Sequence, residues 1–149
     1  QNSSGLNNQA TFNISFDVTG HMGDDLYIDK TCNAIPRDIP GMGTALATSQ
    51  LSFTVEDDNG AIPQSLVTSC SLTTATDAVV FPKAYRVNDE STERFTLTVV
   101  AKPNTAGTYR MRIVGIGYNT TSGDIEGNQV VSNNAGALID LRTQYVTIN

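Results

Sequence analysis

Apolar and polar residues alternate strictly over residues 12–18 near the start of the chain. Because the side chains of a strand point alternately to its two faces, a period of two predicts a strand with one apolar and one polar face. The apolar positions of this strand are Phe12, Ile14, Phe16 and Val18. Such a pattern is typical of a sheet that is buried on one side and solvated on the other.

Similar segments follow along the chain. We expect strands over 26–28, 51–56, 84–87, 95–100, 108–118 and 138–148, with shorter β-branched runs near 66–67 and 79–81. Asn59-Gly60 is a strong tight-turn signal after the strand at 51–56, and the prolines and glycines within 31–48 indicate an extended connection. No segment keeps a period of 3.6 residues. The sequence therefore predicts an all-β, antiparallel sandwich of about seven to nine strands.

A chain of 149 residues is the right length for one domain. Residues 1–9 are polar and without periodicity, so we expect a flexible N-terminal arm followed by a single domain over 10–149. Gln1 stands where an initiating methionine would be, which favours processing and the removal of a signal peptide. On that basis the protein is expected to be secreted or displayed at the cell surface.

The formal net charge of −6 argues against several classes of partner. The nine lysines and arginines are scattered, so no basic stripe is available to neutralise nucleic-acid phosphates or an anionic membrane surface. No apolar run approaches the roughly 20 residues of a membrane span. We therefore expect neither nucleic acid nor a membrane-spanning segment.

Two cysteines, Cys32 and Cys70, allow a single pairing. The expected export favours a disulfide, which would close a loop of about 39 residues and stabilise the fold by ~4 kcal/mol on the chain-entropy estimate. The alternative is a pair of buried, reduced thiols. Their spacing excludes a CxxC redox or zinc motif.

One part of the chain resembles a known family. Residues 95–99 read FTLTV, a Pro-Asn turn follows, and residues 105–113 read TAGTYRMRI. This segment is similar to the E strand, corner and F strand of immunoglobulin-like domains, and the runs NISFDVTG and YVTIN are similar to such domains in microbial surface proteins. The resemblance implies that Tyr109 forms a tyrosine corner, with its hydroxyl bonded to the corner backbone. The tryptophan and the inter-sheet cysteine spacing of antibody domains are absent.

Catalytic chemistry finds little support in this sequence. His21 is the single histidine and lies in a glycine-flanked turn, so we expect no catalytic triad and no enzyme. Carboxylates in two turns are candidate Ca²⁺ ligands, provided that the two turns meet at one end of the sandwich. These residues are Asp24, Asp25, Asp57 and Asp58. The alternative is plain turns whose acidic side chains bond the local backbone, and no cofactor is required.

The sequence offers candidate residues both for binding glycans and for carrying them. Without tryptophan, a carbohydrate platform would fall to tyrosines, namely Tyr27, Tyr85, Tyr118 and Tyr145. The glycosylation pattern N-x-[ST] occurs three times, at Asn2, Asn13 and Asn119, each where we expect exposure.

The segment 108–118 carries apolar residues in both phases, because Val114, Ile116 and Tyr118 follow the opposite phase to Tyr109. Either a bulge near Gly115 restores the phase, or both faces of the strand are covered. The second option makes Val114, Ile116 and Tyr118 candidates for self-association. Phe12, Ile14 and Phe16 are further candidates, since their strand can pair within its own sandwich or complete that of a neighbour.

These observations favour an extracellular structural or adhesive subunit, one that assembles with copies of itself or with neighbouring surface domains into a filament or layer. The alternative is a carbohydrate- or calcium-dependent ligand-binding module of a larger surface protein.

Overall fold

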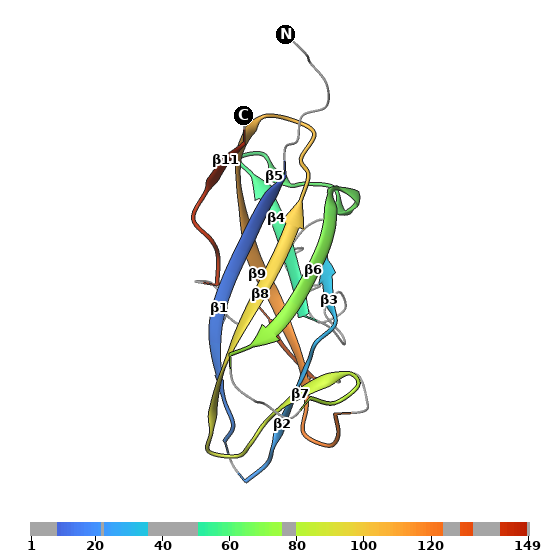
Figure 1. The fold of residues 1–149 in the computed structure, drawn as a ribbon, viewed down its shortest axis with the longest axis vertical. Coiled ribbons are helices and arrows are strands. Elements are labelled where there is room, and N and C mark those ends of the chain that lie inside the picture. Colours follow the sequence, from blue (N-terminus) through green and yellow to red (C-terminus); the bar gives the residue numbers. More distant parts are fainter. Residues whose placement is uncertain are drawn as a thin grey trace.

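The computed structural model describes residues 9–21, 23–35, 51–75, 80–123, 129–132 and 141–148. These residues form two sheets and a single 3-10 turn, and no α-helix lies among them. One sheet lies over the other in Figure 1. The all-β class and the two-layer arrangement predicted from the alternating pattern are confirmed, whereas the immunoglobulin-like topology stays a prediction.

The smaller sheet has three strands in the order β1-β8-β6. Strand β1 (Ala10–Thr19) pairs with β8 (Thr92–Ala101) over ten successive residue pairs without a bulge. Strand β6 (Val67–Thr74) follows the turn η1 (Gln64–Leu66) and pairs with the other side of β8. Both pairings are antiparallel. Because β8 pairs with a strand on each side, it is the central strand of this sheet.

The larger sheet follows the order β3-β4-β9-β2-β7. Its members are β2 (Leu26–Asp29), β3 (Cys32–Ala34), β4 (Leu51–Asp57), β7 (Ala84–Val87) and β9 (Gly107–Asn119). Three short strands lie off this path: β5 (Gly60–Ala61) pairs with β4, whereas β10 (Gln129–Ser132) and β11 (Val146–Ile148) pair with β9. Strands β3 and β4 run parallel, so the expectation of a wholly antiparallel sandwich is wrong at this edge.

Strand β9 is the longest strand and organises the larger sheet. Tyr118 pairs with both β2 and β10, and Gly115 pairs with both β4 and β10. Since each residue has one partner on each side, β4 and β2 follow one another along one edge of β9. Strands β10 and β11 occupy the opposite edge, and between them the amide of Ile113 donates to the carbonyl of Leu141.

The core lies between the two sheets. It takes alternate residues from β1 and β8, which explains why the patterns at 12–18 and 95–100 are so regular. Phe95, Leu97 and Val99 are fully buried, and so are Phe53 and Met111 on the facing sheet. The core therefore forms where the apolar phases of both sheets meet.

Several expected elements differ in the structure. The described residues hold eleven strands, more than the expected seven to nine, because short segments such as β3 and β5 pair along existing edges at positions where the sequence pattern predicts no strand. The strand expected over 138–148 is wrong in extent: within the described part, only Val146–Ile148 is a strand. Most of the connection expected over 31–48, and most of the N-terminal arm, lie outside the described residues.

Candidate functional site

A disulfide joins the two sheets at one side of the sandwich. Cys32 on β3 and Cys70 on β6 are bonded, with their Cα atoms 6.2 Å apart. The predicted bridge is therefore confirmed. Because β3 belongs to the larger sheet and β6 to the smaller one, the bond acts as a clamp between the two layers.

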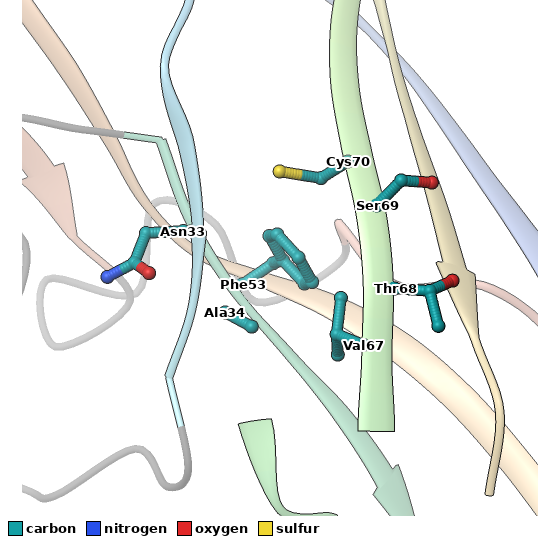
Figure 2. Close-up of a pocket in the computed structure, with 7 residues that line it drawn as sticks. All are labelled: Asn33, Ala34, Phe53, Val67, Thr68, Ser69 and Cys70. Carbon is teal, nitrogen blue, oxygen red and sulfur yellow. The ribbon is translucent and has the colours of Figure 1, made fainter. Parts of the chain in front are cut away.

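A cleft of about 290 Å³ opens beside this clamp, between β3 and β6. Figure 2 shows Phe53 between the two strands, with Val67 and Cys70 on the β6 side and Ala34 on the β3 side. Phe53 is fully buried and forms the floor of the cleft. The cleft is lined by Asn33, Ala34, Phe53, Val67, Thr68, Ser69 and Cys70. No acidic or basic side chain is among them, so this cleft offers no general acid or base.

The opposite side of the smaller sheet ends at β1. Its inward residues are buried, and its outward residues are exposed and contact β8 through side chains. Ser15 and Thr96 share a hydrogen bond of 2.8 Å between their hydroxyls, and Thr98 donates to Asn13 over the same distance. Among the described residues, β1 pairs with β8 alone. Its second edge is therefore the candidate interaction site.

The one charged side chain that β1 contributes is matched within the sheet. Asp17 accepts hydrogen bonds of 2.7 and 3.0 Å from Nε and Nη2 of Arg94 on β8. These bonds lower the pKa of the Asp17 carboxyl from its ordinary value. The edge therefore presents a neutralised ion pair rather than a lone charge.

The acidic turns do not meet. Asp24 and Asp25 follow the end of β1, whereas Asp57 is the last residue of β4 and Asp58 follows it, at the opposite end of the sandwich (Figure 1). The two turns therefore do not converge, and the prediction of a calcium site that they share is wrong. No group of three or more potential ligands from His, Cys, Asp and Glu occurs among the described residues.

Of these carboxylates, Asp57 bonds the backbone of its own turn, as the alternative interpretation expects, whereas Asp25 and Asp58 bond other segments of the chain. Asp25 accepts from the amide of Asp89 at 3.0 Å and lies 3.9 Å from Nε of Arg86. Asp57 accepts from the amide of Asn59 at 2.7 Å, and Thr108 donates to Asp58 at 3.4 Å.

The three glycosylation sequences have different surroundings. Asn13 is exposed on the outward face of β1, as expected. Asn119 is only 1% exposed, and its Oδ1 accepts from the amides of Thr121 and Ser122. The expected exposure of Asn119 is therefore wrong, because its side chain caps the turn that follows β9. Asn2 lies outside the described residues.

The residues predicted for self-association are mostly part of the protein's own core. Phe12, Ile14 and Phe16 are buried, because β1 pairs within its own sandwich. In β9 the register shifts by one residue at Val114, so a bulge does restore the phase and turns Ile116 towards the core. Val114 is also buried, and Tyr118 packs against the core. The prediction that these side chains are free to dock onto another molecule is therefore wrong.

Tyr109 has the contact that a tyrosine corner requires. Its side chain is 1% exposed, and its hydroxyl donates to the carbonyl of Thr105 at 2.8 Å. The hydroxyl of Thr105 lies at the same distance from that of Tyr109. The bond ties the start of β9 to the turn after β8.

An ionic cluster on β4 and β9 has no signal in the sequence. Glu56 contacts Nη2 of Arg110 at 2.6 Å and Nη2 of Arg112 at 3.6 Å. The guanidinium of Arg110 also lies 4.9 Å from the ring centroid of Tyr145. These residues are far apart along the chain, and only the pairing of Glu56 with Arg110 brings them together.

The remaining candidate residues have separate surroundings. His21 is exposed. Tyr27 contacts Phe81, Tyr85 contacts Phe95, and Tyr118 packs against the core. In the described part of the chain, no helix is long and apolar enough to cross a membrane.

Comparisons with protein-family models, with curated proteins and with solved structures find no match to this chain.

Proposed function

We propose that this protein is an extracellular structural or adhesive subunit that associates with copies of itself, or with neighbouring surface domains, through the edges of its sheets. The observation that carries this proposal is the second edge of β1, which none of the described residues pairs. An unpaired edge offers a row of backbone donors and acceptors to a further strand.

The disulfide supports an extracellular setting. A bond between Cys32 and Cys70 persists in oxidising compartments, and cytosolic thiols are normally kept reduced. The bridge also clamps the two sheets at the side of the sandwich away from β1.

Growth into a filament or layer needs two different contact surfaces on each subunit, since a twofold contact alone stops at a dimer. The sandwich has two separate sides: one is bounded by β1 and the other by β6 and β3. The first is an open edge and the second carries the cleft beside the disulfide. We propose that β1 provides one contact and that the second lies elsewhere on the surface.

The ligand-binding alternative has no comparable support. Its calcium-dependent form required the turns at Asp24-Asp25 and Asp57-Asp58 to converge, and they lie at opposite ends.

Sedimentation velocity of the oxidised protein at rising concentration, with electron microscopy of the same samples, tests the proposed function. We expect sedimentation coefficients that rise with concentration, both with and without added calcium. Compact monomers over the whole range, from micromolar to millimolar, would refute assembly as the function of this protein. Glycan binding by such monomers would favour the alternative.

A further inference from the structure

We infer that β1 pairs antiparallel with β1 of a second copy, about a twofold axis at Ser15, so that the two three-stranded sheets join into one continuous sheet. This inference rests on the proposed function and names its first contact. It assigns the partner, the strand direction and the register.

The hydrogen-bond pattern shows which backbone groups of β1 are available. The amide of Gly20 donates to the carbonyl of Ser91 at 3.0 Å, in the same register that pairs β1 with β8. In an antiparallel pair, residues that bond their partner strand alternate with residues that do not. The even-numbered residues of β1 therefore bond β8. The N–H and C=O groups of the odd-numbered residues, from Thr11 to Thr19, point to the second edge.

Strand β1 lacks three of the features that usually prevent strands from pairing between molecules. Such features are bulges, prolines, lysines and covering segments. Strand β1 has none of the first three: its register is unbroken over ten residues and its sequence is ATFNISFDVT. Because its register is regular, the backbone N–H and C=O groups of its second edge are evenly spaced for hydrogen bonds to a further strand.

The other outer strand of this sheet, β6, is protected. Its register with β8 shifts between Val67 and Ser69. The hydroxyl of Tyr85 donates to the carbonyl of Leu72 at 3.0 Å, and Cys70 is held by the disulfide. Of the two outer strands of this sheet, β1 therefore has the more regular edge for pairing with a second copy.

The charges of β1 fit a second copy of the same strand. Asp17 is the single charged residue of β1, and Arg94 of the same copy already neutralises it. In an antiparallel pair centred on Ser15, Asp17 lies opposite Asn13 of the second copy and far from the second Asp17. The outward side chains of Thr11, Asn13 and Ser15 are uncharged and polar, so no like charges meet across the contact.

The number of bonded pairs selects this register. The five outward residues, Thr11, Asn13, Ser15, Asp17 and Thr19, are symmetric about Ser15. Only an axis at Ser15 lets all of them join bonded pairs, which gives about ten main-chain hydrogen bonds. Moving the axis by one residue to Ile14 leaves Thr19 without a partner and reduces this number to about eight. The contact is isologous, as twofold dimers require.

Cysteine cross-linking tests the register. Ser15→Cys places two thiols on the axis, where bonded pairs have Cα atoms about 5.5 Å apart, within the range of a disulfide. Asn13→Cys is the matched control: Asn13 is also exposed and also bonded to a threonine of β8. In this register, however, its Cα lies roughly 14 Å from that of its symmetry mate, because the two are four residues apart along neighbouring strands. We expect Ser15→Cys to form covalent dimers at least tenfold faster than Asn13→Cys on mild oxidation.

A charge variant tests the contact itself. Ser15→Lys puts two lysines on the axis, whereas Ser71→Lys makes the same change of net charge on β6, where Ser71 is also exposed. General repulsion between copies of net charge −6 would fall equally in both variants. We expect the dimer dissociation constant from sedimentation to rise at least tenfold for Ser15→Lys, and not for Ser71→Lys. Circular dichroism checks that both variants are folded.

The outcomes separate this inference from the proposed function. Preferential cross-linking through Ser15→Cys together with weakened association of Ser15→Lys alone supports both. Association that is equally strong in the two lysine variants, or faster cross-linking through Asn13→Cys, overturns the pairing through β1 at Ser15 and leaves assembly through another surface. A wild-type protein that stays monomeric overturns both proposals.

Discussion

Replacing Tyr109 by phenylalanine removes one hydroxyl from an otherwise unchanged core. The ring is 1% exposed, and the hydroxyl donates to the carbonyl of Thr105 over 2.8 Å. Thr105 itself is exposed, so water can reach this turn and replace part of the lost bond. We therefore expect a loss of about 0.5–1.5 kcal/mol in the free energy of unfolding, which is the net value of one hydrogen bond rather than a full desolvation penalty.

Urea unfolding of the oxidised protein, followed by circular dichroism, measures this loss. In a thermal unfolding experiment, the melting temperature of a domain of this size should fall by about 2–4 °C for each kcal/mol lost from the free energy of unfolding. Tyr145→Phe is the control, because Tyr145 is 47% exposed and its described contact with Arg110 uses the ring. A loss for Tyr109→Phe below about 0.5 kcal/mol, or one equal to that of the control, would refute the structural role of this hydroxyl.

Two further predictions concern the disulfide and the ion pair of β1. Replacing Cys32 and Cys70 together by alanine should lower the free energy of unfolding by ~4 kcal/mol in urea titrations, because the unfolded chain regains the freedom of a loop of about 39 residues. A loss below ~1 kcal/mol would contradict this entropic account. The pKa of Asp17 should lie below 3.8 in an NMR titration and return to the ordinary range in Arg94→Gln. Since the folded-state pKa is lowered, the stabilisation is complete above the unfolded pKa and is lost as the pH falls through the folded pKa. An Asp17 pKa that is the same in the two proteins would show that the ion pair does not persist in solution.

The local pattern of the sequence determined the strands of the core. Every second residue is apolar along β1 and, from Phe95 onwards, along β8, and all of these residues except the half-buried Val18 are buried. A period of two requires no knowledge of the partner strand, because the backbone of any strand turns successive side chains to opposite faces. The turn at Asn59-Gly60 was predictable for a similar reason: Gly60 adopts a φ of 127°, which glycine readily accepts.

The partners of the disulfide were also predictable from the sequence, because a chain with two cysteines allows a single pairing. The sequence did not show that their bond joins different sheets. That placement depends on β3 lying beside β4 and on β6 lying beside β8. The alternation within one strand does not say which other strand lies beside it, so neither pairing was predictable from the sequence.

Tertiary structure alone decided which surfaces are covered. Ser52 and Thr54 alternate with apolar residues in β4, so a period of two alone places them on the polar face, yet each is 1% exposed. The bulge at Val114 resolves the double phase of β9, and Asn119 is buried by the turn that it caps. A period of two tells the two faces of a strand apart, but burial also depends on what packs against each face. The unpaired edge of β1 has the same origin: alternation assigns Thr11 to Thr19 to a strand, whereas the strand order β1-β8-β6 leaves that strand at the edge of its sheet.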